Sequence, residues 1–284
     1  MKIAVFLHLY YTEMLDELLS HIENLSALQD IEYDLIVTLC HKNPELEQKI
    51  YAFKDNAQIM LVPNRGYDVA PFLQAVKSIH LSGYDYIIKL HSKRDLSSPA
   101  YLPSCTLYGC EWRQKLLEFM SSPKHLQESL LRFDKNPQIG MLTAPELIIS
   151  AYKEDHQALD RATQIMHGMG LSLKNKTFVA GTMFIARASL FRLWKHLPYD
   201  ASDFEEFNPT HKGGSLAHAL ERVLGFMISA QGFQISSYYP VGFSYKMKVL
   251  GYKFRNFIYY KRTNSSGKTH IKIFKIPVYS KSKK

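Results

Sequence analysis

Short apolar runs alternate with amphipathic segments in the N-terminal third of the chain, and this alternation limits the folds that it can adopt. The apolar runs predict strands at residues 3–7, 33–39, 57–62 and 84–90. The segments between them predict helices at 12–28, 44–53 and 71–79. This order favours an α/β, Rossmann-like, mainly parallel sheet with helices on both faces, whose ligands bind beyond the carboxyl ends of the strands.

The second half of the chain is less regular. It predicts a helix at 111–120, strands at 139–143 and 178–187, and a helix that starts at Ser215. Gly181 interrupts the last of these strands, and a glycine there marks a bulge or a close approach of the backbone to a ligand. We expect one domain over residues 1–245 and a basic, aromatic C-terminal extension over 246–284.

Charge is distributed unevenly along the chain. Residues 222–284 contain 13 Lys and Arg residues and no Asp or Glu, whereas residues 1–221 contain 22 basic and 26 acidic residues. Aromatic residues are interleaved with the cations at 252–262, a mixture that suits an anionic membrane surface. Nucleic-acid binding and a solvated extension are the alternatives, and we expect the membrane surface rather than nucleic acid.

The compartment is predicted from cysteines and hydropathy. Cys40, Cys105 and Cys110 are too few for a disulfide framework and lack the second ligand pair of a structural zinc site, which favours a reducing cytoplasm. The N-terminal apolar run is too short for a signal peptide, and no apolar run is long enough to span a bilayer. We expect a cytoplasmic protein, peripheral on the inner face of the cell membrane.

Polar residues follow each of the first four predicted strands. The first strand is followed by His8, and the third by a loop that contains Asn64, Gly66 and Asp68. Glycine allows a turn or a close approach to a ligand, and Asn and Asp side chains can hydrogen-bond a ribose or a base edge. The alternative interpretation is an ordinary turn.

The loop after the fourth strand brings several basic side chains together. His91, Lys93 and Arg94 follow Lys89 at the end of this strand. Two cations and an imidazole suit a diphosphate whose negative charge grows as a sugar leaves. A solvated loop with ordinary charges is the alternative.

The predicted helix from Ser215 contains a candidate catalytic base. His218, Glu221 and Arg222 lie three or four positions apart, so they share one face. A carboxylate placed there could remove a proton from an acceptor hydroxyl. An ion pair that only stabilises the helix is the alternative.

Five sequence blocks together resemble the rhamnan synthesis protein F family. They are residues 64–73, 84–94, 112–113, 180–187 and 217–222, and the resemblance covers about residues 1–245. It implies a GT-A-type glycosyltransferase that extends cell-surface polysaccharide or lipopolysaccharide, often with rhamnose from a dTDP donor. The implied partners are a dTDP- or UDP-linked sugar and a glycan or lipid-linked glycan acceptor.

The resemblance also suggests which residues would act. We expect the nucleotide sugar to contact His8, Asn64, Gly66, Asp68, Lys89, His91, Lys93, Arg94, Gly181 and Thr182. By similarity to inverting GT-A enzymes, Glu221 is the first candidate for the general base and Glu206 or Glu205 the second, with His91 also in a catalytic role. Direct displacement would invert the anomeric carbon.

One departure from the GT-A pattern concerns the metal. Those enzymes usually end the fourth strand with Asp-x-Asp, whereas here Asp95 is the only acidic residue of 91–95. We therefore predict no required cofactor, with Mg or Mn held by Asp95 and the diphosphate as the alternative. A non-catalytic carbohydrate-binding or scaffold protein of polysaccharide assembly is the alternative function. A dehydrogenase is disfavoured because no Gly-x-Gly-x-x-Gly follows the first strand.

Overall fold

A computed structural model describes residues 1–151, 156–206, 214–263 and 269–281, which form two compact units. The first unit contains Met1–Lys93 and Leu116–Tyr239, and the second contains Arg94–Lys115 and Pro240–Lys284. The second unit thus includes a segment before the C-terminal region that the sequence did not group with it. The boundary expected at 245/246 stays a prediction.

A seven-stranded sheet forms the centre of the first unit, in the order β11-β7-β10-β4-β1-β2-β3. The strands are β1 (Lys2–Leu9), β2 (Glu32–Leu39), β3 (Gln58–Leu61), β4 (Tyr86–His91), β7 (Ile139–Thr143), β10 (Phe184–Arg187) and β11 (Gln234–Ser237). Only β10 runs antiparallel to its neighbours, β4 and β7, among the strands of this sheet. The predicted mainly parallel sheet is confirmed.

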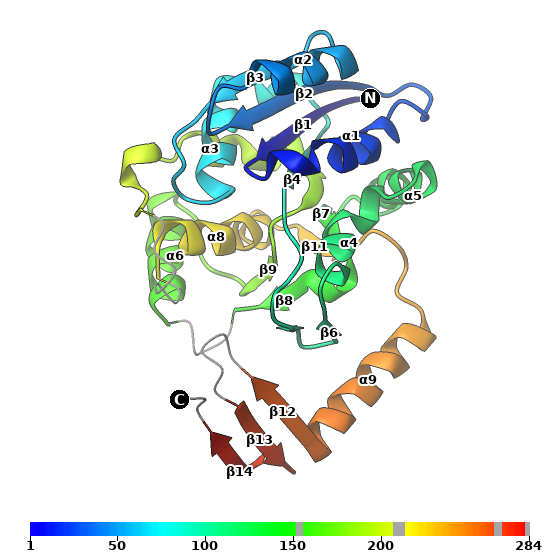
Figure 1. Cartoon of the computed structure of the whole chain (residues 1–284), viewed down its shortest axis with the longest axis vertical. Helices are drawn as coiled ribbons and strands as arrows, with labels where there is room; N and C mark the ends of the chain where they lie inside the picture. Colours follow the sequence, from blue (N-terminus) through cyan, green and yellow to red (C-terminus); the bar gives the residue numbers. More distant parts are fainter. Residues whose placement is uncertain (152–155, 207–213, 264–268, 282–284) are drawn as a thin grey trace. The chain divides into compact units, whose positions relative to one another are not determined.

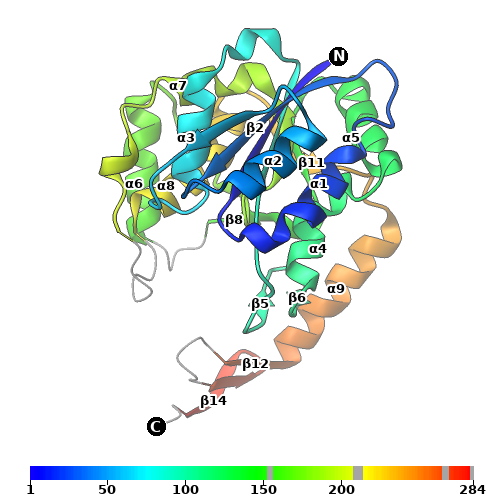
Figure 2. The same ribbon diagram turned by 45° about the horizontal axis from the view of Figure 1, so that its top comes forward.

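Helices cover both faces of this sheet (Figures 1 and 2). One face carries α1 (Leu15–Glu23), α2 (Pro44–Phe53) and α5 (Pro123–Lys135). The other carries α3 (Val69–Ser78), α7 (Arg192–Lys195) and α8 (Leu216–Ala230), and α6 (His156–Gly168) packs on α8. The short strands β8 (Ile148–Ser150) and β9 (Thr177–Val179) pair with each other.

Burial on both faces explains the long apolar runs of the central strands. Residues 3–7 of β1 and residues 35–37 of β2 are all buried, as expected for parallel strands between two helical layers. Gly225 allows α8 to approach β9, because a Cβ at this position would lie 2.4 Å from the Cα of Phe178. This close packing holds α8 against β9.

Local signals explain where the predicted boundaries hold and where they shift. Helix α2 has the predicted bounds because Asn43 caps it, its Oδ1 accepting from the Leu46 N–H at 3.1 Å, and a proline follows at the first helical position. The helix predicted at 12–28 is shorter, with a 3-10 turn at Thr12–Met14 followed by α1. Leu25 is still buried because the chain turns there, its N–H bonding the Ile22 carbonyl at 2.9 Å.

The second unit contains several small elements. They are β5 (Ala100–Tyr101), β6 (Thr106–Leu107), most of α4 (Glu111–Leu117), α9 (Phe243–Ile258), β12 (Tyr259–Thr263), β13 (Thr269–Ile273) and β14 (Ile276–Lys281). Strands β12, β13 and β14 form an antiparallel sheet. Across the described residues, no helix is long and apolar enough to cross a membrane.

Candidate functional site

A cavity lies at the carboxyl ends of β1 and β4, next to the loop between β3 and α3. It is lined by His8, Tyr10, Tyr11, Asn64, Tyr67, Asp68, His91, Ser92 and Lys93. His8 and His91 are direct partners in the register of β1 with β4. Five of the residues expected to contact a donor therefore surround one cavity, at the edge where parallel sheets bind ligands.

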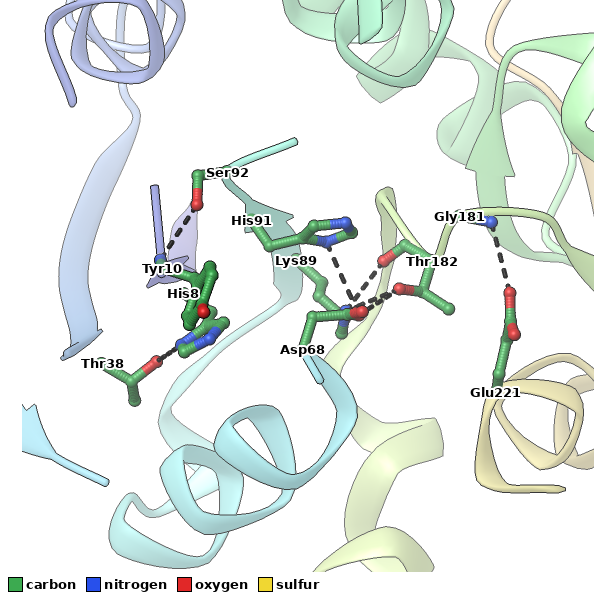
Figure 3. A network of polar contacts seen from close by, with 10 residues as sticks. All are labelled: His8, Tyr10, Thr38, Asp68, Lys89, His91, Ser92, Gly181, Thr182 and Glu221. Atoms are coloured by element: carbon green, nitrogen blue, oxygen red, sulfur yellow. Dashed lines mark hydrogen bonds and ion pairs between the residues drawn. The ribbon is translucent and has the colours of Figure 1, made fainter. Parts of the chain in front are cut away.

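Ser92 connects the two strand ends that form this cavity (Figure 3). Its Oγ accepts hydrogen bonds from the backbone N–H groups of Tyr10, at 2.9 Å, and Tyr11, at 2.8 Å. Its own N–H donates to the His8 carbonyl at 2.9 Å. Neither Ser92 nor the lining tyrosines are among the residues predicted from the sequence to contact a donor. Their position in the same loops at the strand ends could have indicated that they belong to the site.

Lys89 is buried under the cavity and holds Asp68. Its Nζ lies 2.5 Å from Asp68 Oδ2, 2.8 Å from Thr182 Oγ1 and 3.1 Å from the Thr182 carbonyl (Figure 3). These three contacts use the three N–H donors of the ammonium group. Lys89, which was expected to contact the donor, does not line the cavity and is 1% exposed. It instead positions Asp68.

Asp68 is an ionised carboxylate at the cavity wall. Burial acts to raise its pKa, but the positive charge that His91 carries at low pH, the charge of Lys89 and the hydrogen bonds from Lys89 and Thr182 outweigh burial and hold the pKa well below its usual value. The side chain keeps 19% of its surface exposed. The cavity therefore offers a fixed negative acceptor for hydroxyl or N–H groups.

The two histidines of the cavity are neutral near pH 7. Burial lowers the pKa of His91 to about 3 and that of His8 to about 4. His91 Nδ1 lies 3.5 Å from Asp68 Oδ2, and His8 Nδ1 lies 2.9 Å from Thr38 Oγ1. His91 thus contributes an imidazole without positive charge. Among the described residues that line the cavity, Lys93 is the one Lys or Arg side chain.

Arg94 and Asp95 lie in the second unit and do not line the cavity. Both side chains are exposed, and Asp95 forms an ion pair with Arg113. The expected cluster of His91, Lys93 and Arg94 therefore does not line the cavity as a set of cations. Within the part of the chain that the structure describes, no group of three or more His, Cys, Asp or Glu side chains could hold a metal ion. Metal independence stays a prediction.

Gly66 has a conformational reason to be glycine. Its φ is +66°, and a Cβ would lie 2.3 Å from the Phe204 ring and 2.6 Å from the Ala70 Cβ. The next residue, Tyr67, is also left-handed with φ +54° and lines the cavity. Gly66 therefore shapes the loop, and its backbone is not among the cavity-lining residues.

The Gly181–Thr182 turn connects the Lys89 cluster to Glu221. Gly181 and Thr182 have φ values of +76° and +51°, and a left-handed threonine is held only where surrounding contacts determine it. The Gly181 N–H donates to Glu221 Oε1 at 3.3 Å (Figure 3). Thr182 accepts hydrogen bonds from Lys89 through its carbonyl and its Oγ1, and these bonds help to hold its left-handed backbone.

Glu221 lies beside the cluster without lining the cavity. Burial, together with the negative charge of Asp68, raises the pKa of Glu221 to about 7, although its side chain is 24% exposed. It therefore titrates in the range that suits a general base.

The other members of this helix face support the start of α8. Arg222 Nη1 donates to the His218 carbonyl at 2.6 Å and lies 3.7 Å from Glu221 Oε2. The His218 Nδ1 lies 2.6 Å from the Oγ of Ser215, the residue that caps the helix. Arg222 thus contacts both other members of this face, and the His218 ring meets the ring of the cavity-lining Tyr67 edge-on, with 5.7 Å between the centroids.

The second candidates for the base lie elsewhere. Glu206 is 83% exposed and pairs with Arg65 at 2.8 Å. Glu205 pairs with Arg161 and accepts from the Leu216 N–H at 2.9 Å, at the start of α8. Neither carboxylate lines the cavity.

The family is decided by a match that covers most of the chain. Residues 1–233 match the family model described as Rhamnan synthesis protein F. The chain belongs to this family. The expected family assignment is thus confirmed, and so is the α/β fold that it implied.

Curated relatives of this family member are longer than the chain. Uncharacterized protein WxcX of Xanthomonas campestris pv. campestris (strain B100) is 26% identical over 244 residues, which cover 82% of this chain and 32% of the relative. The protein of the same description from strain ATCC 33913 matches with the same figures. The chain spans about a third of the length of these relatives.

Solved structures show more distant similarity. S. aureus TarS 1–349 in complex with UDP has 12% identity and a TM-score of 0.43, covering 91% of this chain and 66% of that one. Core-mannan synthase A from Aspergillus fumigatus, in its Mn/GDP form, has 14% identity and a TM-score of 0.32, covering 82% and 72%. Glucosyl-3-phosphoglycerate synthase from Mycobacterium tuberculosis, with Mn2+, UDP and glucosyl-3-phosphoglycerate, has 9% identity and a TM-score of 0.33, covering 99% and 90%.

Proposed function

We propose that this family member is a GT-A-type glycosyltransferase that moves a sugar from a nucleoside-diphosphate donor to a growing cell-surface polysaccharide or lipopolysaccharide. The observation that carries the proposal is the strand-end cavity, which places the ionised Asp68 and the cation Lys93 together. A nucleotide sugar presents both hydroxyl donors and a diphosphate, so it matches both charges. The family resemblance favours dTDP-rhamnose, with a UDP-linked sugar second.

Each lining group has a role in this proposal. Lys93 binds the diphosphate, and Asp68 accepts hydrogen bonds from ribose or sugar hydroxyls. Tyr10 and Tyr11 provide aromatic surface against a base or a sugar ring. Lys89 and Thr182 keep Asp68 ionised and in place.

Glu221 acts as the general base in the proposed reaction. Its carboxylate takes the proton of an acceptor hydroxyl, whose oxygen forms the bond to the anomeric carbon. The bond between that carbon and the diphosphate oxygen breaks at the same time, and the diphosphate leaves with the electron pair. Attack opposite the leaving group inverts the anomeric carbon. A pKa near 7 supports this role, because both protonation states are then accessible.

We further propose that the leaving diphosphate is stabilised by Lys93 and by polar groups of the cavity, without a required metal. Chelation tests this part of the proposal. Transfer that persists in saturating chelator supports it, and transfer that stops and returns on adding Mg2+ or Mn2+ contradicts it. The second outcome would favour the alternative in which Asp95 and the diphosphate hold the ion.

The function itself is tested by measuring transfer from dTDP-, UDP- and GDP-linked sugars to glycan or lipid-linked glycan acceptors. We expect transfer by the wild type and its loss in Glu221→Gln. Binding of glycan with no transfer from any donor would support the non-catalytic carbohydrate-binding alternative. In the cell, the proposed location is the cytoplasmic face of the membrane.

A further inference from the structure

Helix α9 exposes a continuous apolar stripe along its length. The stripe consists of Phe243, Met247, Leu250, Phe254 and Phe257, which are 78%, 47%, 58%, 63% and 43% exposed. Spacings of four, three, four and three residues keep these side chains on one side of a helix. None of the side chains of α9 is fully buried. A stripe of this kind on a folded helix indicates a surface that contacts a partner.

The opposite side of α9 faces its own unit. Tyr245, Val249, Tyr252 and Asn256 are the partly buried residues there. The Tyr252 hydroxyl lies 2.8 Å from Thr106 Oγ1, which belongs to the same unit. The apolar stripe is therefore on the side of the helix away from these contacts, and at its C-terminal end the Phe257 ring also contacts Phe274, with 6.0 Å between the ring centroids.

Cations lie on both sides of the stripe, but at different distances from it. At 100° per residue, Lys246 and Lys253 lie along one edge of the stripe. Lys248 and Arg255 lie on the other side, farther round the helix, and all four cations are exposed. The helix contains no acidic residue, and none follows Glu221 in the sequence. Long cationic side chains beside an apolar face can keep their charges at the level of lipid headgroups while the stripe enters the bilayer.

Charge selects among the possible occupants of this stripe. Its spacing also suits a coiled coil with a second copy, but coiled coils pair opposite charges beside the apolar seam, and two copies of α9 would bring only cations. The helix has 16 residues, so it is roughly 24 Å long and does not match a membrane-spanning helix. An anionic lipid surface complements both the stripe and its borders.

We propose that α9 lies in the plane of an anionic bilayer, with the Phe243–Phe257 stripe inserted at the headgroup boundary and with Lys246 and Lys253, along its edge, on lipid phosphates. This docking would bring the first unit to lipid-linked acceptors. That purpose rests on the proposed function, whereas membrane binding itself does not. Lipid binding is measured without any sugar transfer. A failure of the membrane proposal is therefore distinguishable from a failure of the proposed glycosyltransferase activity.

The test is co-sedimentation of the full chain with phosphatidylcholine vesicles that contain or lack phosphatidylglycerol. We expect binding to the anionic vesicles that weakens as salt rises, and little binding to the neutral ones. Leu250→Gln should weaken binding about tenfold, because it removes an inserted apolar side chain. Leu131→Gln, on the exposed face of α5, is the matched control and should bind like the wild type.

The bordering cations are tested in the same assay. Lys246→Gln with Lys253→Gln should weaken binding about thirtyfold, at about fivefold for each cation. Lys124→Gln with Lys135→Gln removes the same charge from α5 and should have a much smaller effect.

Thermal unfolding of each variant confirms that it is folded before binding is compared. Equal binding to neutral vesicles, or α9 variants that bind like their α5 controls, would overturn the proposal. It would also be overturned if sedimentation velocity showed a concentration-dependent dimer that Leu250→Gln abolishes while vesicles bind no protein. That last result would assign the stripe to a second copy of the chain.

Discussion

The two units of this protein differ in where charged and apolar side chains lie: the first buries a charged side chain, and the second exposes apolar ones. In the first unit, Lys89 is almost fully buried and each of its donors has an acceptor on Asp68 or Thr182. In the second unit, α9 exposes apolar side chains next to the exposed cations Lys246 and Lys253. Buried, paired charge fixes the geometry of a site, whereas exposed charge next to apolar surface suits contact with a partner. The comparison predicts that substitutions in the two units will affect different properties.

The largest effect is expected from Glu221→Gln. Loss of a general base typically lowers a rate by about 10²–10⁴-fold, and the amide keeps the size of the side chain. Transfer should fall by this factor in a steady-state assay while the melting temperature changes little. Glu206→Gln is the matched control, because Glu206 is exposed, and it should change the rate less than about twofold. Equal losses in the two variants would contradict the assignment of the base.

Lys89→Met should lower the free energy of unfolding by about 3 kcal/mol, because it leaves the Asp68 carboxylate without its buried partner. Chemical denaturation measures this change, and Lys124→Met on exposed α5 should cost less than about 0.5 kcal/mol. Adding Asp68→Asn to Lys89→Met removes the unpaired charge and should recover part of the loss. Unfolding of Lys89→Met at the wild-type midpoint would show that the pair does not stabilise the fold.

The raised pKa of Glu221 predicts two opposite pH dependences. If ionised Glu221 is the base, the rate should fall about tenfold for each pH unit below about 7. The folded-state pKa lies above the ordinary value of 4.5, so the associated stability is present below pH 4.5 and is lost as pH rises through about 7. Wild-type stability measured relative to Glu221→Gln should decline over this interval. A flat difference would contradict the raised pKa.

The smallest effect is expected in the apolar stripe of α9. Leu250→Ala should change the free energy of unfolding by less than about 0.5 kcal/mol, because Leu250 is 58% exposed. Leu220→Ala in α8 should cost about 2–5 kcal/mol, since Leu220 is fully buried. Denaturation of both variants under the same conditions tests the contrast. A large loss in Leu250→Ala would mean that the stripe is part of a core.

Much of the fold could be predicted because the local signals agree. The bounds of α2 follow from its cap and proline, and β7 has the predicted bounds at 139–143. The helix expected at 12–28 is too long because apolar spacing continues into a turn, where Leu25 is buried without being helical. Apolar spacing reports burial, and burial extends beyond the end of this helix.

The site could be predicted only as far as the strand ends. The rule that parallel sheets bind ligands at their carboxyl edge located His8, Asp68 and His91 around one cavity. It did not show that Lys89 is enclosed, because the Lys89 contacts to Asp68 and Thr182 span 21 and 93 residues of sequence. Nor could sequence show that burial leaves the histidines neutral, since this depends on the surrounding tertiary packing.

The central claim is that the strand-end cavity binds a nucleoside diphosphate through Lys93. Isothermal titration of dTDP and UDP into the wild type, Lys93→Gln and the exposed-surface control Lys124→Gln tests it most directly. We expect at least one nucleotide to bind the wild type and the control equally, and to bind Lys93→Gln about tenfold or more weakly, because a charge-assisted contact is lost. Equal binding by all three proteins, or no binding of either nucleotide to the wild type, would contradict the account.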